Sequence, residues 1–534
     1  MFLKSRSISA EMLVVLSAII LSSFYNIAFF YQTSLVYPLI AKSIPFYMSL
    51  YINLLMLNVV IITIFNFKHT LKPFLIFIFF ITNFIAYPMK QYGIVFDESM
   101  ILSIVKTDPK EVADLLDVKL FITLLFGILP GVVIWFIRIN YTSLKKNIMN
   151  KIIFILAPVL ICVLTTLAFS QNYASFFREH KPLRYYVNPY HALFSLGKTI
   201  FKTPGTKEEM KILGQDAIVP PVDIDRDLVI LVIGETARAD RFSLNGYRRE
   251  TNPLLKKEHV FSFKKMTSCG TSTAISVPCM FSNFGRSAFK NAKANSTENL
   301  LDILSHTKDV SILWRDNNSD SKGVAVRIAY QDFQSKALNP ICDPECRDVG
   351  MLTDLQKYID EQKTKDVLIV LHQMGNHGPA YYKRYPKEFE IYQPACQFTE
   401  IERCNLNEIN NAYDNAILYT DYFLSKVIEL LKNNSKKFDT SMIYMSDHGE
   451  SLGENGIFLH GLPYFMAPRE QKEIASILWF GDRYLKHLDE AKLNQQLTQD
   501  YSHDNLFHTV LGLFEIQSEV YDKKLDLLNG VLAH

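Results

Sequence analysis

The sequence predicts a protein of two parts: five transmembrane helices at the N-terminal end, followed by an α/β domain with a mostly parallel central sheet. Residues 1–171 contain five apolar stretches, each close to the roughly 20 residues that cross a bilayer as a helix. Six of the seven cysteines come after residue 171 and fall in close pairs. From residue 226 onward, short apolar runs alternate with helix-compatible segments, as in parallel sheets that helices cover on both faces.

The composition agrees with this division. The chain has 534 residues, enough for a membrane part and a complete soluble domain. Hydrophobic residues make up 49% of it, a high share for a protein that is soluble throughout. The formal net charge of +2 gives no reason to expect nucleic-acid binding. We expect a transmembrane domain over 1–171, an interfacial segment and linker over 172–225, and a soluble domain over 226–534.

The five apolar stretches predict transmembrane helices at 11–32, 46–67, 71–88, 120–139 and 152–171. The first is too long for a secretory signal peptide and lacks a cleavage site. Lys and Arg, which mark cytoplasmic segments, precede the first stretch and lie between the second and third and between the fourth and fifth. We therefore expect a cytoplasmic N-terminus and everything after residue 171 outside. The 89–119 segment, also assigned outside, is an exception with four lysines: Lys90, Lys106, Lys110 and Lys119.

The cysteines indicate the same side of the membrane. Cys162 lies in the fifth apolar stretch, where it serves as a small apolar residue. Six cysteines allow 15 connectivities, and pairing between sequence neighbours is the simplest. Zinc binding is the alternative, but no His lies near them at finger-like spacing. We predict three disulfides, and hence an oxidising compartment, between the pairs Cys269/Cys279, Cys342/Cys346 and Cys396/Cys404.

Residues 172–198 mix aromatic rings with Arg and Lys. This composition favours a segment in the headgroup region of the membrane, where rings and cations both find partners; a plain connecting loop is the alternative. A linker containing Pro204-Gly205 and Pro220-Pro221 follows, and the soluble domain begins near residue 226.

The soluble domain contains five runs that predict strands, at 228–235, 310–318, 367–377, 441–450 and 475–482. Longer helix-compatible segments, such as 408–433, separate them. Ligands of parallel sheets bind beyond the carboxyl ends of the strands. The first four runs end in polar groups: Glu235, then Arg315, Asp316 and Asn317, then His372 and His377, then Asp447 and His448.

These polar strand ends predict a metal or an anionic substrate, because unpaired charges are costly to bury. Glu235, Asp447 and His448 form a ligand set suited to zinc or manganese. For any one of them alone, pairing with a surface cation is the ordinary interpretation. The convergence of four strand ends favours a functional site.

The stretch "TSCGTSTAISVPC", residues 267–279, crowds hydroxyl side chains between two cysteines. A surface loop rich in Ser and Thr is one interpretation. The other is a nucleophile, since a metal or a base can activate a weak hydroxyl. We expect Gly270 to permit an unusual backbone turn, and 273–277 to open a helix whose amide groups face an anion. These residues alone do not choose among Thr271, Ser272 and Thr273.

Seven motifs carry a resemblance to a known family: "GETARAD", "TSCGTSTAISVPCMFS", "LWRDNNSDSKGV", "ECRDVG", "LHQMGNHGPAYYKRY", "NAYDNAI" and "SDHGESLGENG". With them the soluble domain resembles the alkaline phosphatase and sulfatase superfamily. The whole chain resembles the lipid A phosphoethanolamine transferases, which include the mobile colistin-resistance enzymes. The resemblance implies an alkaline-phosphatase-like, zinc-dependent catalytic domain over 226–534, in the periplasm.

The resemblance implies roles for individual residues. Thr273 becomes the nucleophile, and at least one zinc, with a second possible during turnover, is held by Glu235, Thr273, Asp447 and His448. His377 and His460 match positions that contact the phosphoethanolamine group or a second zinc, and either can act as acid or base. Lys322 matches a residue near the same pocket.

The resemblance also implies a donor-lipid loop, "MILSIVKTDPKEV", with substrate contacts at Ser103, Thr107 and Glu111. Ser103 departs from the family, since it stands where Asn is expected. Ser321 and Ala325 stand where some relatives carry two further cysteines.

The reaction implied is transfer of phosphoethanolamine from phosphatidylethanolamine to a lipid A phosphate, through phosphoethanolamine-threonine. The implied setting is the bacterial inner membrane, as a monomer among membrane lipids, and the implied consequence is resistance to polymyxins and other cationic peptides. A phosphoglycerol transferase of the lipoteichoic acid synthase type is one alternative, which the paired cysteines and the 267–282 motif disfavour. A catalytically inactive lipid-binding membrane protein is another, which the complete set of mapped ligands disfavours.

Overall fold

The computed structural model describes residues 7–106, 118–141, 143–202, 209–220, 225–343 and 345–532. The chain divides into two compact units. The first unit comprises Met1–Ile101 and Leu116–Thr203, and the second unit comprises Leu102–Leu115 and Pro204–His534. Several residues named above lie outside the described parts of the chain: Thr107, Lys110, Glu111, Pro204, Gly205 and Pro221.

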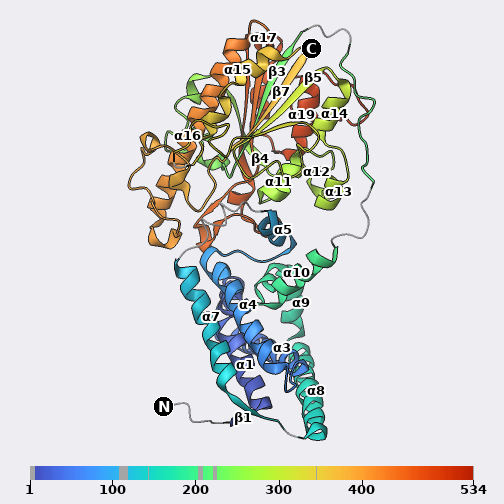
Figure 1. Cartoon of the computed structure of the whole chain (residues 1–534), viewed down its shortest axis with the longest axis vertical. Helices are drawn as coiled ribbons and strands as arrows, with labels where there is room; N and C mark the ends of the chain where they lie inside the picture. Colours follow the sequence, from blue (N-terminus) through green and yellow to red (C-terminus); the bar gives the residue numbers. More distant parts are fainter. Residues whose placement is uncertain are drawn as a thin grey trace. The chain divides into compact units, whose positions relative to one another are not determined.

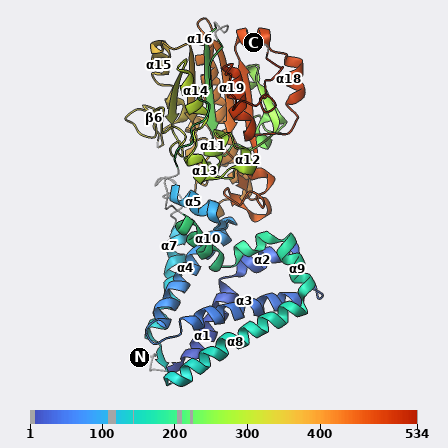
Figure 2. The same cartoon turned by 90° about the vertical axis from the view of Figure 1, so that its right-hand side faces the viewer.

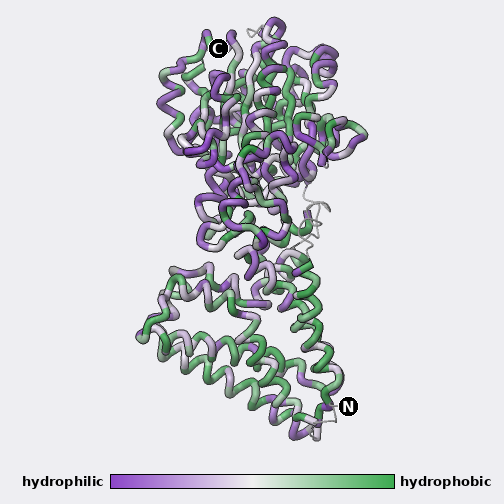
Figure 3. Tube along the Cα trace, turned by 90° about the vertical axis from the view of Figure 1, so that its left-hand side faces the viewer, coloured by the Kyte–Doolittle hydropathy of each residue, from purple (hydrophilic) through white to green (hydrophobic). Residues whose placement is uncertain are grey.

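The first unit is helical, and its helices are hydrophobic over most of their length (Figure 3). Four helices are long and apolar enough to cross a membrane: α3 (Ile44–Ile64), α4 (Leu71–Tyr92), α7 (Val118–Phe136) and α8 (Leu144–Ala168). The pair α1 (Ala10–Phe24) and α2 (Ile27–Val36), bent by 48°, passes the same test together. The bent pair corresponds to the first predicted span, so the described residues confirm a membrane part with four or five spans.

Polar side chains hold the bend between α1 and α2. The Asn26 amide donates to the carbonyls of Leu21 and Asn188, each at 3.0 Å. The backbone N–H of Asn188 donates back to Asn26 Oδ1 at 2.9 Å. Such bonds satisfy the backbone groups that a bent helix releases within a membrane.

Helices α4 and α7 run side by side in opposite directions (Figure 2). The Asn83 amide, in the middle of α4, donates to the carbonyl of Thr123 in the first half of α7 at 2.6 Å. Gly127 makes this approach possible, because a Cβ there would lie 2.4 Å from the Asn83 side chain. Small residues bring membrane helices together in this way.

Residues 172–198, predicted to be interfacial, lie within α9 (Ser170–Glu179), a 3₁₀ turn (Lys181–Tyr186) and α10 (Tyr190–Lys202) of the first unit. Phe176 and Tyr186 are buried inside this unit, whereas Phe177 is exposed. The remaining elements of the unit are α5 (Glu98–Lys106), whose last residues belong to the second unit, and the parallel pair β1 (Ser7–Ser9) and β2 (Arg138–Asn140).

The second unit is built on an eight-stranded sheet in the order β12-β4-β11-β8-β3-β7-β5-β6 (Figure 1). Its four central parallel strands are β8 (Asp439–Ser446), β3 (Asp227–Gly234), β7 (Asp366–His372) and β5 (Val310–Asp316). Their residues are almost all buried, which explains the continuous apolar runs in the sequence. The sheet confirms the predicted α/β fold.

On the β11 side of β8 the sheet departs from the parallel pattern, whereas the strand beyond β5 continues it. Strand β11 (Glu473–Phe480), the last predicted strand, is antiparallel to β8 and to β4 (Phe261–Thr267). The sequence did not reveal β4, because exposed Lys264 and Lys265 interrupt its apolar residues. The edge strands are β12 (Tyr501–Ser502) and β6 (Ala329–Asp332), and a separate hairpin-like pair is β9 (Ser451–Leu452) with β10 (Phe458–Leu459).

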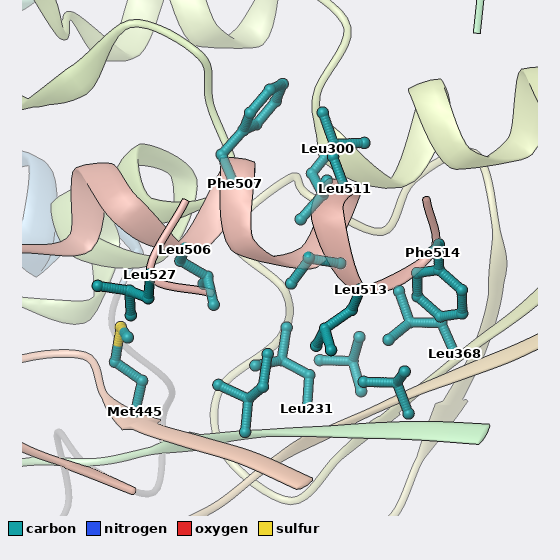
Figure 4. Packing of buried hydrophobic residues seen from close by; sticks show 14 of the residues in the cluster. Leu231, Leu300, Leu368, Met445, Leu506, Phe507, Leu511, Leu513, Phe514 and Leu527 are labelled. Carbon is teal, nitrogen blue, oxygen red and sulfur yellow. The ribbon is translucent and has the colours of Figure 1, made fainter. Parts of the chain in front are cut away.

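Helices cover both faces of the sheet. On one face α14 (Leu300–Thr307) and α19 (Leu506–Leu513) pack against β3, β7 and β8. There Leu513 lies near Leu231, and Leu511 lies near Leu300 (Figure 4). On the other face lies α16 (Leu406–Asn434), which begins with a capping box of Asn405 and Glu408. Shorter helices complete the unit: α11 (Thr273–Met280), α12 (Gly285–Ala288), α13 (Asn291–Asn295), α15 (Leu355–Glu361), α17 (Asp482–His487) and α18 (Glu490–Gln496).

Candidate functional site

Three potential metal ligands meet where β3 and β8 end. The two strands are parallel neighbours, and Gly234 pairs with Ser446, so Glu235 and Asp447 leave the sheet side by side. Ligand atoms of Glu235, Asp447 and His448 all lie within 4.8 Å of one another. His448 Nε2 lies 3.4 Å from Glu235 Oε1 and 3.2 Å from Asp447 Oδ2. All three side chains are fully buried.

The hydrogen bonds of Asp447 and His448 engage one atom of each side chain and leave the other, Asp447 Oδ2 and His448 Nε2, facing the cluster. Asp447 Oδ1 accepts the N–H groups of Thr236 and His448, while Oδ2 is buried and accepts no hydrogen bond from the described residues. His448 Nδ1 donates to the carbonyl of Gly449 at 2.9 Å, which leaves Nε2 as the ligand atom. Burial lowers the pKa of His448 well below its usual value and therefore keeps the ring neutral.

This donor set fits a zinc ion. Two carboxylates and a neutral imidazole are zinc ligands, and a buried carboxylate oxygen without a partner is costly unless a cation binds it. Burial also raises the pKa of Asp447 to about 6. A cation at this position would reverse that effect by favouring the ionised form.

Thr273 is the hydroxyl that lies at this cluster. It is the first residue of α11, and its hydroxyl donates to Glu235 Oε2 at 3.1 Å and lies 3.4 Å from His448 Nε2. The hydroxyls of the two other candidates bond to partners outside the ligand cluster. Thr271 donates to the carbonyl of Leu462 at 2.6 Å, and Ser272 accepts from Ser103 at 3.0 Å. The geometry therefore singles out Thr273.

A disulfide between Cys269 and Cys279 constrains the loop before Thr273. The two other predicted pairs, Cys342 with Cys346 and Cys396 with Cys404, are also disulfide-bonded. Gly270 does not adopt a left-handed backbone, contrary to the expected unusual turn. It is needed for space instead, because a Cβ there would lie 2.7 Å from the Ile275 side chain.

His503 links this loop to β8. Its Nδ1 accepts the N–H of Cys269 at 3.0 Å, and its Nε2 donates to the carbonyl of Ser446 at 2.9 Å. Burial lowers the pKa of His503 to about 4, so the ring stays in the neutral form that this pair of bonds requires. The loop that carries Thr273 and the strand that precedes Asp447 are thereby fixed to each other.

His377 and His460 lie beside the ligand cluster. The ring centroid of His460 is 4.3 Å from that of His448 and 5.4 Å from that of His377. His460 Nδ1 donates to Glu450 Oε2 at 2.7 Å, and the other oxygen of Glu450 accepts the Tyr381 hydroxyl at 2.6 Å. Burial and the neighbouring His460 lower the pKa of His377 well below its usual value.

Lys322 and Ser103 also belong to the second unit. The Lys322 ammonium donates to the carbonyls of Ser319, at 2.6 Å, and Lys106, at 3.0 Å. Ser103, near the end of α5, reaches Ser272, the residue before Thr273. The structure thus brings Ser103 to the nucleophile loop, while Lys322 bonds its own loop and the end of α5. Thr107 and Glu111, predicted with Ser103, fall outside the described residues.

The polar residues at the end of β5 bond to neighbouring strands and loops and not to the ligand cluster. Asp316 accepts from His372 Nδ1 at 2.9 Å and from the Trp314 indole at 2.8 Å. Arg315 turns away and donates to the carbonyls of Met351 and Thr353. The predicted convergence therefore holds for Glu235 and Asp447, whereas Arg315 contributes to packing.

The sequence did not reveal three supporting residues, although each lies in a motif or strand end noted above. Asn318 donates to Glu235 Oε2 at 2.8 Å. Glu450 holds His460, as described. Asp348 accepts the backbone N–H groups of Met374 and Gly375, just before His377. Gly375 has a φ of +53° and a Cβ there would lie 2.9 Å from the Glu235 carbonyl, so this loop requires glycine.

Comparison with protein families agrees with this geometry. A family model described as "Sulfatase" matches residues 227–516, which is more than half of the chain. A second, described as "Phosphoethanolamine transferase EptA/EptB", matches residues 54–203.

Individual relatives match over nearly the full chain. Phosphatidylethanolamine transferase Mcr-1 of Escherichia coli is 40% identical over 529 residues, 96% of each chain. Phosphoethanolamine transferase EptA of E. coli K12 is 37% identical over 536 residues, 98% of each chain. The structure of lipooligosaccharide phosphoethanolamine transferase A from Neisseria meningitidis superimposes with a TM-score of 0.93 at 31% identity, covering 99% of this chain and 100% of that one. The chain therefore belongs to the phosphoethanolamine transferase family and is a membrane enzyme with a sulfatase-like domain.

Proposed function

We propose that this enzyme transfers phosphoethanolamine from phosphatidylethanolamine to a phosphate of lipid A, through a covalent intermediate on Thr273. The position of the Thr273 hydroxyl, 3.1 Å from Glu235 and 3.4 Å from His448, carries the proposal. Relatives named as phosphoethanolamine transferases, among them a Kdo(2)-lipid A phosphoethanolamine 7''-transferase of E. coli K12, support the donor group and the acceptor class.

The site is arranged for attack on phosphorus. Glu235, Asp447, His448 and Thr273 would hold one zinc ion, which when bound would favour the ionised hydroxyl and offset negative charge on the phosphoryl oxygens. Thr273 opens α11, an eight-residue helix, so the first N–H groups of that helix are available to an anionic phosphoryl group.

In the first step, a bond forms between Thr273 Oγ1 and the phosphorus of phosphatidylethanolamine. The phosphorus–oxygen bond to glycerol breaks, and diacylglycerol leaves with the proton that Thr273 gives up. We assign this proton transfer to His460, because Glu450 fixes its Nδ1 and directs its other nitrogen away from that carboxylate. His377 and Lys322 are assigned to the phosphoethanolamine group.

In the second step, a lipid A phosphate oxygen attacks the same phosphorus. The bond to Thr273 Oγ1 breaks, and Thr273 regains a proton through the same histidine. The product phosphate is masked by an ethanolamine cation, which weakens its attraction for polymyxins and other cationic peptides.

The proposed location of the enzyme follows from its substrates, because the donor and the acceptor are both membrane lipids. The enzyme lies in the bacterial inner membrane as a monomer, with its N-terminus in the cytoplasm and its second unit in the periplasm. The lysine pattern and the three disulfides support this orientation.

The test is mass spectrometry of lipid A from a Gram-negative host that expresses the intact chain, Thr273→Ala or Thr267→Ala. Thr267 is the matched control, since its hydroxyl donates to the carbonyl of Tyr501 in the same stretch. Phosphoethanolamine on lipid A is expected with the intact chain and with Thr267→Ala but not with Thr273→Ala. Addition by Thr273→Ala would contradict the nucleophile, and no addition by the intact chain would contradict the acceptor.

A further inference from the structure

We propose that Arg286, Tyr464 and Lys472, called here the Tyr464 cluster, bind a phosphate of the acceptor lipid other than the one that receives phosphoethanolamine. All three residues belong to the second unit. The proposal rests on the proposed transfer to lipid A, a lipid that can carry two phosphates, and it adds a specificity site to that reaction. The cluster holds one phosphate while the other is presented to the group on Thr273.

Two cations of the cluster lie over one aromatic ring. The guanidinium carbon of Arg286 is 3.7 Å from the ring centroid of Tyr464, and the Lys472 ammonium is 5.3 Å from the same centroid. Arg286 is exposed, and Tyr464 and Lys472 are half-buried, so all three keep surface that a ligand can reach. A guanidinium that stacks on a ring keeps its N–H groups available, and these groups match the geometry of a phosphate.

The ring holds like charges close together. Burial and the charge of Arg286 lower the pKa of Lys472, while Glu470 and Glu473 act in the opposite direction. The carboxylate of Asp504, near Arg286, accepts the backbone N–H of that residue at 2.8 Å. Within the described parts of the chain, neither the Arg286 nor the Lys472 side chain forms an ion pair with a carboxylate. A phosphate bound by both cations offsets their repulsion, which contact with the ring alone does not.

The cluster is built on segments that contact the nucleophile loop. The carbonyl of Lys472 accepts the backbone N–H of Ser268 at 2.8 Å. The loop that carries Tyr464 accepts the Thr271 hydroxyl, as described above. Arg286 lies in α12, which packs on α11 (Figure 1). A lipid held by the cluster therefore lies beside the segment that carries the nucleophile, where its second phosphate is placed for attack.

Exposed aromatic surface adjoins the two cations. Phe465, the residue after Tyr464, is 58% exposed. The Lys293 ammonium lies 3.9 Å from the ring centroid of Phe284. The segment 283–297, which follows the nucleophile helix, contains three basic residues and no acidic one. Cations beside aromatic rings fit an amphiphile with a phosphate group and acyl chains, which is the chemistry of lipid A, better than they fit a free anion.

The competing explanation is structural, since cation–π contacts can also fix the loop that carries Tyr464. The two explanations differ in which step of the reaction they affect. A structural role predicts that loss of the cations lowers stability and slows both steps. An acceptor site predicts that the first step is unchanged, and that the second is weakened only for an acceptor with two phosphates.

The test is steady-state kinetics of the full-length enzyme in detergent, with phosphatidylethanolamine as donor and either diphosphoryl or monophosphoryl lipid A as acceptor. Arg286→Gln combined with Lys472→Gln should raise the KM for diphosphoryl lipid A by about 30-fold with kcat little changed, because charge-assisted bonds to a non-reacting phosphate are lost. For monophosphoryl lipid A, the double variant and the intact enzyme should have the same KM. Diacylglycerol release without an acceptor should also be the same in both.

Lys436→Gln combined with Lys437→Gln is the matched control. These exposed lysines precede β8, at the opposite end of that strand from Asp447, so all of these quantities should stay unchanged. Lys472→Arg, which keeps the charge, should retain most of the affinity for diphosphoryl lipid A.

Two results would overturn the proposal. One is an equal rise in KM for both forms of lipid A, and the other is slower diacylglycerol release together with a lower Tm in the double variant. Failure of the intact enzyme to modify either form would contradict the proposed function. Modification by the intact enzyme with an unchanged KM in the double variant would contradict the Tyr464 cluster alone, so the two failures are distinguishable.

Discussion

Two buried carboxylates of the second unit, Asp447 and Asp348, differ in how many of their oxygens accept hydrogen bonds. This difference distinguishes a candidate metal ligand from a carboxylate that supports a loop. Asp447 is 0% exposed and Asp348 is 3% exposed, and burial raises the pKa of both. Asp348 accepts hydrogen bonds on both oxygens, from the side chains of Asn317 and Gln373 and from the N–H groups of Met374 and Gly375. Asp447 accepts hydrogen bonds on one oxygen, and among the described residues its other oxygen has no donor.

The comparison shows that burial does not identify a functional carboxylate. Both groups are equally hidden from water, and a buried polar group is ordinarily hydrogen-bonded. Asp348 follows that rule and fixes the loop before His377. Asp447 breaks it beside Glu235 and His448, where a cation would replace the missing donor.

The largest effect is expected for Asp447→Asn. An amide removes one negative charge from the ligand cluster, so zinc content should fall below a tenth of that of the intact chain, and phosphoethanolamine transfer should fall by about 1,000-fold. Zinc is measured by inductively coupled plasma mass spectrometry and transfer by a fluorescent phosphatidylethanolamine assay. A chelator should lower the Tm of the intact chain but not that of Asp447→Asn, because only the former binds the metal. Equal zinc in both proteins would contradict the assignment.

Asp348→Asn is the matched change at the saturated carboxylate. The amide nitrogen cannot accept the N–H of Gly375, so buried donors lose partners and the free energy of unfolding should fall by about 3 kcal/mol. Zinc content should stay unchanged, while transfer falls by about 10- to 100-fold through the displaced His377 loop. Thermal unfolding followed by tryptophan fluorescence measures the loss of stability. Loss of zinc without loss of stability would erase the distinction between the two carboxylates.

Glu450→Gln tests a carboxylate that acts through a histidine. Glu450 accepts from His460 Nδ1 and from Tyr381, so the amide should weaken the orientation of His460 and lower kcat by about tenfold, with zinc content and KM little changed. Tyr381→Phe, which removes the other hydrogen bond, should have a smaller effect. A pH profile of kcat that is identical in the intact chain and Glu450→Gln would contradict this role.

His503→Gln should have the smallest effect on transfer, and its main effect should be on the pH dependence of stability. The folded pKa of His503 is about 4, below the unfolded value of about 6.5, so the unfolded chain binds more protons between these values. The stability contributed by neutral His503 is present above pH 6.5 and is lost as pH falls toward 4, by up to about 3 kcal/mol. The Tm of His503→Gln should therefore fall less between pH 6.5 and 4.5 than that of the intact chain. Parallel pH curves for the two proteins would contradict the lowered folded pKa of His503.

The sequence contained enough to predict the central sheet and the ligand cluster. Strands β3 and β8 are buried on both faces, which produces apolar runs that end visibly at Glu235 and Asp447. Strand β4 escaped notice because Lys264 and Lys265 lie on an exposed part of it. The strand pattern was sufficient for Glu235 and Asp447 because neighbouring parallel strands end at the same edge.

Supporting residues could not be predicted in the same way. Asp348 and His503 act through partners far along the chain: Met374 is 26 positions from Asp348, and the Cys269 N–H is 234 positions from His503. The choice of Thr273 over Thr271 and Ser272 likewise depended on which hydroxyl faces the cluster. The reason for Gly270 also could not be predicted. A special turn was expected there, whereas the structure shows that glycine is needed because the backbone lies close to Ile275.

In the proposed reaction, Thr273 carries phosphoethanolamine between donor and acceptor. The most direct measurement is peptide mass spectrometry of the full-length enzyme, incubated in detergent with phosphatidylethanolamine and without lipid A, then quenched in acid and digested. We expect a phosphoethanolamine adduct on Thr273, with diacylglycerol released in equal amount and neither product from Thr273→Ala. An adduct on Ser272 or Thr271, or diacylglycerol released with no adduct on the chain, would contradict this role of Thr273.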